Sequence, residues 1–323
     1  MKKIPVVICI DVEPEDRETG RGSVSDWAGV DETIEFFSAL RPRLELATGA
    51  PARFCWFFRM DPQVEHTYGV TSWGVERYRE HIRKLEAAGD ELGLHTHAWR
   101  WDATTQGWVI DHGDQAWVEH CVRTSIDTYR KVFGRACRSF RFGDRWMNNE
   151  TIALLESSGI EFDLTLEPGR HVSPDLEEVH TGTLPDYRDV PTWPYRPAQH
   201  EFRRRGRRSA RDLWVIPLST GRFWPSRFAP LERGARALGI NLHRRHETTP
   251  LFLNLERPRF ELMVNSLLAV WTKPFLAPVL RSDAAGKVKC KANMRDNVEF
   301  LLTHPLASRF RFVRPHEAIE LLS

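Results

Sequence analysis

Acidic residues and histidines that could hold a metal ion stand where two apolar runs of the sequence end. The run IPVVICID ends in Asp11 and is followed closely by Glu13, and the run ELGLHTH ends with His95 and His97. Residues i and i+2 of a strand point to the same face, so each pair can address one point. Carboxylates and imidazoles suit a borderline divalent cation such as zinc. A catalytic site would use three of these ligands and leave one position for water.

Each pair also has an ordinary structural explanation, because a strand-end acid or histidine is commonly a cap, a turn residue or a surface group. The two pairs together, at the ends of nearby strands, favour a metal site more than either pair alone. One carboxylate would remain as a general base, and an arginine would keep that base ionised and oriented. Three further polar residues end or lie in later strand-like runs: Arg141 and Asp144 in SFRFGD, and Asp163 in IEFDLTLE.

Alternating strand-like and helix-like segments must position these residues. Strand patterns are predicted at 4–11, 52–58, 91–97, 139–144 and 160–167, with helices at 31–49, 75–89, 115–134 and 148–159. This alternation predicts a parallel α/β sheet, in which ligands bind beyond the carboxyl ends of the strands. The later half is less regular, with strands expected at 213–220, 251–256 and 275–282, helices at 257–271 and 293–305, and a closing strand and helix within 309–322.

The order of these motifs resembles the polysaccharide deacetylase family (NodB-homology domain, carbohydrate esterase family 4), in a branch whose first motif reads Asp-x-Glu or Asp-x-Asp. The matching stretches lie within residues 4–167 and read CIDVEPE, DELGLHTHAW and SFRFGDRWMNNETIALLESSGIEFDLTLEP. The resemblance implies an α/β fold with a single distorted (β/α)7-like barrel. It also implies metal-dependent removal of an acyl group from an N-acylated sugar. We therefore expect one catalytic domain over residues 1–323, with a long insertion at about 168–211.

The family's roles transfer to this sequence where its motifs match. Asp11 would be the general base, and Arg141 would orient it. Glu13 and His95 would be metal ligands, and Asp163 would be the family's fourth-motif acid.

The second motif departs from the family pattern. The family places its second histidine four residues after the first, and Trp99 occupies that position here. His97 is the only close substitute, so the predicted ligand set is Glu13, His95 and His97, with Zn2+ as the expected metal.

The general acid is also missing from its usual place. The family takes it from a histidine after a late strand, but the equivalent run here, FLAPVLRSD, ends in Arg281, Ser282 and Asp283. Another residue must then protonate the leaving amine, or the chemistry has changed or been lost. The loop histidines that would have to reach the site are His112, His180 and His200.

The expected substrate is an N-acetylated sugar or a sugar-linked small molecule, on which Trp99 and Trp146 would stack. Tryptophans equally often pack in cores or loops, so this role has an alternative. Two other functions stay open. The chain could hydrolyse a non-sugar amide on the same barrel, because fold does not determine substrate. It could also be a catalytically silent protein that binds a carbohydrate or a nucleotide sugar.

Composition and charge limit the possible binding partners and cellular location of the protein. A net charge of +2 gives no global sign of nucleic-acid or membrane binding, and no apolar run approaches the roughly 18 residues of a membrane span. The five cysteines include no C-x-x-C and indicate reduced thiols in the cytoplasm. The Arg-rich stretch 203–211 is typical of a solvated loop. If it binds a ligand, the phosphates of a diphosphate-linked or lipid-linked sugar suit it better than nucleic acid.

Overall fold

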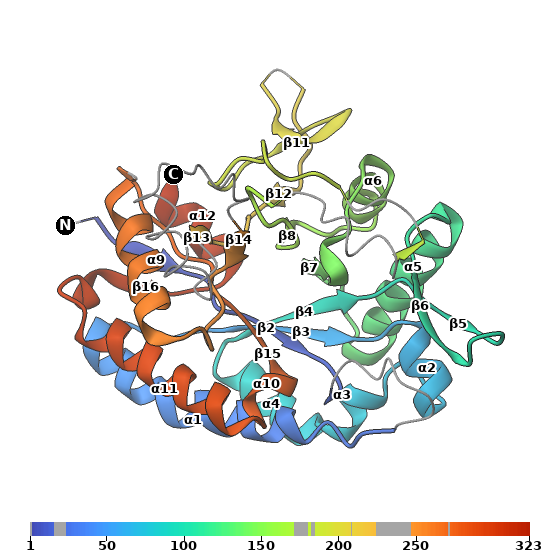
Figure 1. Ribbon diagram of the computed structural model, residues 1–323, viewed down its shortest axis with the longest axis horizontal. Helices are drawn as coiled ribbons and strands as arrows, with labels where there is room; N and C mark the ends of the chain where they lie inside the picture. The colour runs from blue at the N-terminus through green and yellow to red at the C-terminus, as the bar shows by residue number, and fades with distance from the viewer. Residues whose placement is uncertain are drawn as a thin grey trace, which may run out of the picture.

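A curled sheet of parallel strands forms the centre of the protein (Figure 1). The computed structural model describes residues 2–15, 24–170, 180–181, 185–207, 209–223, 247–270 and 272–323. Across the sheet, the strand order is β12 (Trp214–Val215), β8 (Phe162–Asp163), β7 (Ser139–Phe142), β4 (Glu91–Thr96), β3 (Cys55–Arg59), β2 (Cys9–Val12) and β15 (Val279–Arg281). All neighbouring pairs are parallel. The fold is therefore the expected α/β type, a distorted barrel of the (β/α)7 kind.

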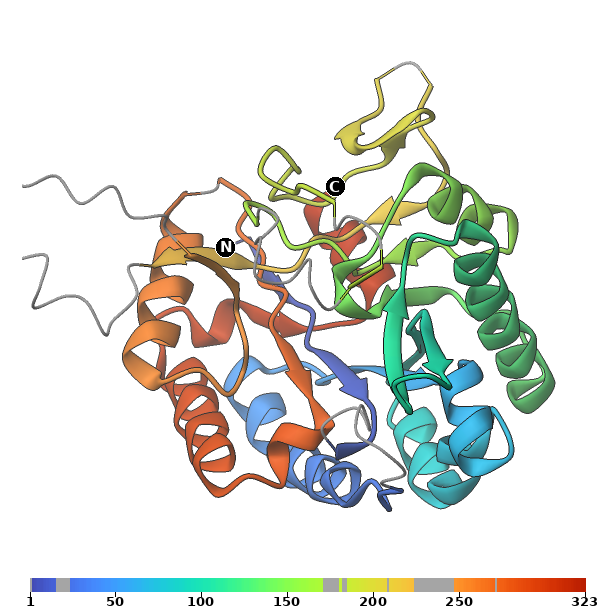
Figure 2. The same cartoon turned by 45° about the vertical axis from the view of Figure 1, so that its right-hand side comes forward.

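Helices pack on the outer face of this sheet and bury its apolar side chains (Figures 1 and 2). The helices that supply this cover are α1 (Ala28–Thr48), α4 (Arg79–Ala87), α5 (Gln115–Phe133), α6 (Asn149–Ser157), α9 (Arg257–Val270) and α11 (Val288–Thr303). A smaller apolar cluster fills the inside of the barrel, and α12 (Pro315–Leu322) contributes to it. No helix in the described ranges combines the length and the apolar character needed to cross a membrane.

Strand alternation decides which residues face the inside of the barrel. In β2, Cys9 belongs to the inner cluster, while Ile10 and Val12 belong to the cluster under the helices. Since neighbours along a strand point to opposite faces, Asp11 and Glu13 turn inward at the carboxyl end of β2. The same alternation in β4, where Leu92 and Leu94 face the helices, turns His95 inward.

Two strand predictions need correction. The run 4–11 is two strands, because β1 (Ile4–Val6) pairs with β16 (Phe310–Phe312) and only β2 joins the main sheet. The strand predicted at 251–256 is wrong, since Phe252 forms only an isolated bridge there. Leu253 N–H still donates to the carbonyl of Val279, but the carbonyls of Leu253 and Leu255 accept from the side-chain amide of Asn297 at 2.9 and 2.8 Å. The predicted helix 75–89 is divided at Tyr78 into α3 (Trp73–Arg77) and α4.

Several short elements lie outside the predicted pattern. They are α2 (Pro62–Tyr68), the hairpin of β5 (Trp99–Asp102) and β6 (Gly107–Asp111), β9 (His180–Thr181), the pair β13 (Thr220–Phe223) and β14 (Glu247–Pro250), and α10 (Ser282–Ala285). The expected insertion at 168–211 includes the hairpin of β10 (Pro197–Ala198) and β11 (Glu201–Arg205), which projects from the barrel in Figure 1. Its residues 171–179, 182–184 and 208 lie outside the described residues.

All five cysteines are free thiols, and four of them are buried, as expected for small apolar side chains. Burial raises the pKa of Cys9 to about 12 and that of Cys55 well above its usual value. A thiol held protonated in this way is a poor nucleophile.

Candidate metal centre

Three donor atoms converge at the mouth of the barrel, from Glu13 after β2 and from His95 and His97 at the end of β4. The two Nε2 atoms lie 3.0 Å apart, and Glu13 Oε2 lies 3.8 Å from that of His95 and 3.5 Å from that of His97. A point equidistant from three atoms with these separations lies about 2.0 Å from each, which matches the ~2.0–2.2 Å bonds of zinc to nitrogen and carboxylate oxygen. The three side chains therefore fit a small divalent cation.

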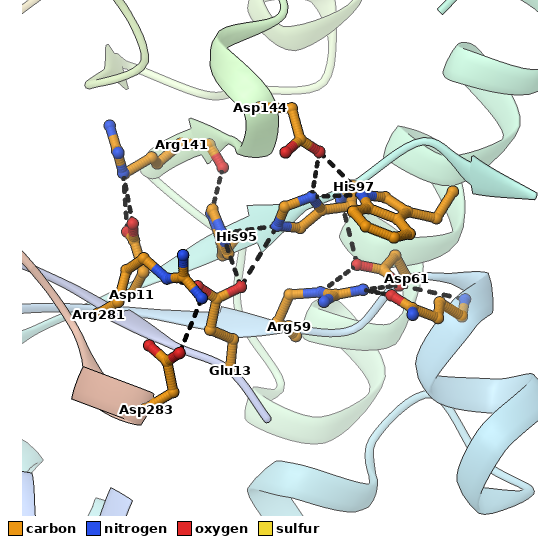
Figure 3. A network of polar contacts seen from close by, with 12 residues as sticks. Asp11, Glu13, Arg59, Asp61, His95, His97, Arg141, Asp144, Arg281 and Asp283 are labelled. Atoms are coloured by element: carbon orange, nitrogen blue, oxygen red, sulfur yellow. Dashed lines mark hydrogen bonds and ion pairs between the residues drawn. The ribbon is translucent and has the colours of Figure 1, made fainter. Parts of the chain in front are cut away.

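Hydrogen bonds on the far side of each imidazole direct its Nε2 to this point (Figure 3). His95 Nδ1 lies 3.0 Å from the carbonyl oxygen of Arg141, and His97 Nδ1 lies 2.6 Å from Asp144 Oδ2. An Nδ1–H that donates to a carbonyl or a carboxylate leaves the lone pair on Nε2. Glu13 is buried, and its Oε2 atom has no hydrogen-bond partner among the described residues. The set thus offers three lone pairs to one position.

The turn after β7 brings Asp144 to His97 at the expense of backbone strain. Asp144 and Arg145 follow Gly143 with φ of 51° and 63°, a left-handed conformation that non-glycine residues rarely adopt. A Cβ at Gly143 would lie 2.2–2.4 Å from ring atoms of His97. Only glycine therefore lets the chain pass this close to the imidazole.

Asp11 lies beside the candidate ligands and is held by Arg141. Arg141 Nε donates to both carboxylate oxygens of Asp11, at 2.7 and 3.0 Å, and its Nη1 donates to the carbonyl of Leu164 at 2.8 Å. Asp11 is 2% exposed. Burial raises the pKa of Asp11 above its usual value, while the positive charge of Arg141 acts in the opposite direction.

Two charged residues at the end of β15, Arg281 and Asp283, also belong to the cluster. Arg281 Nε lies 2.6 Å from Glu13 Oε1, and Arg281 Nη2 donates to Asp283 Oδ2 at 2.9 Å. Burial alone would raise the pKa of Glu13, but Arg281 and the two histidines outweigh it and hold that pKa below its usual range. Glu13 is therefore a carboxylate and not a carboxylic acid.

The two histidines differ in their surroundings. Burial, reinforced by His97, holds the pKa of His95 well below its usual value. Burial also acts to lower the pKa of His97, but Asp144 and Glu13 raise it above its usual value. A buried ion pair holds the backbone of His97. Arg59 donates two hydrogen bonds to Asp61, at 2.6 and 2.8 Å, and Asp61 Oδ2 accepts the backbone N–H of His97 at 3.1 Å.

The charges of the cluster point to a divalent cation. The cluster contains more carboxylates than guanidinium groups (Figure 3). Its three guanidinium groups belong to Arg59, Arg141 and Arg281, and its five carboxylates belong to Asp11, Glu13, Asp61, Asp144 and Asp283. A histidine must be neutral to ligate a metal, and with both imidazoles in that form two negative charges of this set have no compensating guanidinium. Buried charge without compensation is costly, and one divalent cation would neutralise it.

Of the residues singled out in the sequence, the structure brings Asp11, Glu13, His95, His97 and Arg141 together. Asp163 is not among them. It pairs in register with Phe140, whose ring faces the outer helices, and its carboxylate accepts the hydroxyl of Thr165 at 2.6 Å. Burial raises the pKa of Asp163 to about 7. Its catalytic role stays a prediction without a contact to the centre.

The two tryptophans expected to stack on a sugar are both buried. Trp99 Nε1 donates to Asp144 Oδ2 at 2.8 Å and lies 2.8 Å from His97 Nδ1, so this tryptophan helps to hold the ligand's orientation. Trp146 stacks on His112, with ring centroids 4.6 Å apart and planes at 17°. Sugar stacking by either tryptophan stays a prediction.

The structure describes the surroundings of the other histidines considered as a general acid only in part. His112 packs on Trp146, His200 is exposed before β11, and the side chain of His180 lies outside the described residues.

Sequence reasoning missed the support that Arg59, Asp61 and Arg281 give to the centre. Asp61 had a usable signal, because Asp-Pro opens helix α2 as cap and first residue and so announces a turn after β3. Arg281 was placed at the end of a late strand near the expected site, but its pairing with Glu13, at the other end of the chain, had no signal in the sequence.

Solved structures with a similar architecture include proteins named as deacetylases and one named as an allantoinase. A probable polysaccharide deacetylase from Pseudomonas aeruginosa PAO1 aligns with a TM-score of 0.52 at 14% identity, over 99% of this chain and 91% of that one. The Puue allantoinase aligns with a TM-score of 0.53 at 13% identity, over 99% and 90%. A protein named as a glycoside hydrolase/deacetylase from Parabacteroides distasonis aligns with a TM-score of 0.55 at 14% identity, over 99% and 71%. The chain thus has the NodB-like deacetylase fold.

No family model matches the sequence, and no curated protein matches it. At these identities the structural likeness establishes the fold, and the chemistry must be argued from the site.

Proposed function

We propose that the protein is a metal-dependent hydrolase that removes the N-acyl group from an N-acetylated sugar or a sugar-linked small molecule. The observation that carries this proposal is the convergence of Glu13 Oε2, His95 Nε2 and His97 Nε2 beside the pair of Asp11 and Arg141. A divalent cation bound there, zinc being the best match to two nitrogens and one oxygen, would supply a Lewis acid and lower the pKa of water.

The chain's own residues supply the proton chemistry. Asp11 accepts a proton from the water that attacks the amide carbonyl, and Arg141 keeps the carboxylate oriented through two short contacts. The C–N bond then breaks to give a carboxylate and an amine. A guanidinium does not release its proton at physiological pH, so Arg281 is not the acid that serves the amine. Asp11, protonated in the first step, is the group best placed to return that proton.

An assay of acetate release from a panel of N-acetylated sugars tests the function. Asp11→Asn keeps the size of the side chain but removes its basicity, and we expect loss of about 10²–10⁴-fold in rate with metal still bound. The matched control is Asp212→Asn, since the Asp212 side chain is 97% exposed. Full activity in the Asp11 variant would refute the base assignment. If the purified protein contains no metal and takes up none when zinc is added, the result would instead favour a catalytically silent binding protein.

Hydrolysis of a non-sugar amide is the second candidate. The structural likeness to a protein named an allantoinase favours it. Stoichiometric metal, no acetate release from any N-acetylated sugar, and turnover of small non-sugar amides would select this candidate.

A further inference from the structure

Arg281 and its neighbour hold Glu13 by both backbone and side chain. Ser282 Oγ donates to the carbonyl of Glu13 at 3.0 Å and accepts its backbone N–H at 3.1 Å. Arg281, which pairs in register with Asp11, places its Nε 2.6 Å from Glu13 Oε1. Asp283, in turn, accepts from Arg281 Nη2 at 2.9 Å and keeps the guanidinium in place. The loop after β15 thus determines how Glu13 presents its carboxylate.

The two oxygens of Glu13 consequently have different partners (Figure 3). Oε1 faces the Arg281 guanidinium, whereas Oε2 faces the two histidine nitrogens at 3.5 and 3.8 Å. Glu13 is 1% exposed, so its side chain has little freedom to turn. Only one carboxylate oxygen is available to a cation.

The number of available oxygens bears on which cation is preferred. Zinc favours four ligands and accepts nitrogen readily, whereas manganese and calcium favour more ligands and more oxygen. A carboxylate restricted to one oxygen, with two imidazoles, therefore suits zinc. A carboxylate free to bind through both oxygens would improve the site for the larger, oxygen-preferring ions.

We propose that Arg281 is a positioning residue that restricts Glu13 to one ligating oxygen and thereby sets the preference of the centre for zinc over oxygen-preferring divalent cations. This inference rests on the metal site of the proposed function. It assigns a role to the residue that stands where the deacetylase resemblance leads one to expect a proton donor.

The positive charge of Arg281 has a second effect that the test must separate. A guanidinium beside the site repels any divalent cation, so its removal strengthens the binding of zinc and manganese alike. Because both ions carry the same charge, this contribution cancels in the ratio of their dissociation constants. The ratio reports the ligand set alone.

The test measures Kd for Zn2+ and for Mn2+ on the full chain by competition with a chromophoric chelator. Arg281→Met keeps the length of the side chain without charge or donor, and the ratio Kd(Mn)/Kd(Zn) should fall by about tenfold or more. Arg281→Lys keeps a cation for Oε1 and should retain a ratio close to that of the wild type. Arg138→Met is the matched control, because Arg138 pairs with Glu161 at the surface.

An unchanged ratio in folded Arg281→Met protein overturns the inference, as does an equal fall in Arg138→Met. If Arg281→Met does not fold, Arg281→Gln, which is neutral and shorter, takes its place with the same expected fall. Failure of this inference can be distinguished from failure of the proposed function. If the wild-type protein binds neither ion, the metal site itself is refuted. If the wild-type protein binds zinc and the variants keep the same ratio, only the role of Arg281 is refuted.

Discussion

Replacing Gly143 by alanine tests whether His97 is a metal ligand without removing any polar group. A Cβ at this position lies 2.2 Å from Cε1, 2.3 Å from Nε2 and 2.4 Å from Nδ1 of His97. Non-bonded atoms are comfortable at about 3.5–4.0 Å, so the imidazole must move by roughly 1 Å or more. Metal–ligand distances tolerate a displacement of only about 0.2 Å. The moved Nε2 would then no longer reach the point that it shares with Glu13 and His95.

The expected loss of affinity follows from sharing the binding free energy among the ligands. Structural zinc sites release roughly 10–16 kcal/mol over four ligands, so one ligand contributes about 2.5–4 kcal/mol. That corresponds to a rise in Kd of about 10²–10³-fold. Competition with a chromophoric chelator measures this change, and circular dichroism confirms that the variant folds.

Gly107→Ala is the matched control, since a Cβ at Gly107 approaches nothing closer than 3.9 Å. Its zinc affinity should equal that of the wild type. If folded Gly143→Ala protein binds zinc as tightly as the wild type, His97 is not a ligand and the reasoning fails.

Two further variants test the surroundings of the centre. Asp144→Asn removes the charge that orients His97, and we expect zinc affinity to fall by about 10–100-fold in a chelator competition, with unchanged affinity as the contrary result. Asp163→Asn tests the carboxyl whose pKa is raised to about 7 by burial. Because the folded protein holds this proton more tightly than the unfolded chain, Asp163 costs stability progressively as pH rises from about 4 to 7, by up to about 4 kcal/mol. Urea denaturation at pH 5 and pH 8 should show this loss in the wild type and not in the variant; equal pH dependence in both would contradict it.

The positions of Asp11, Glu13 and His95 could be predicted because they depend on short-range rules. A buried strand alternates its faces, and parallel strands place their carboxyl ends together, so the spacing of these residues was sufficient. His97 lies beyond the end of β4, and its place depends on the turn at Gly143, which no periodicity encodes.

The later half of the chain was harder to predict because distant side chains replace regular backbone pairing there. Asn297 satisfies the carbonyls near Leu253 from a helix more than forty residues away, so an apolar run that looks like a strand is not one. Arg281 reaches Glu13 only because β15 and β2 lie side by side. Long-range pairing of this kind follows from the closed fold, and local pattern does not contain it.

Anomalous X-ray scattering at the zinc edge, recorded from crystals of the zinc-loaded wild-type protein, is the decisive test of the metal centre. We expect one strong peak per chain, bonded to Glu13 Oε2, His95 Nε2 and His97 Nε2 at about 2.0–2.2 Å. Zinc bound elsewhere, or no zinc while these three side chains keep their present arrangement, would contradict this expectation.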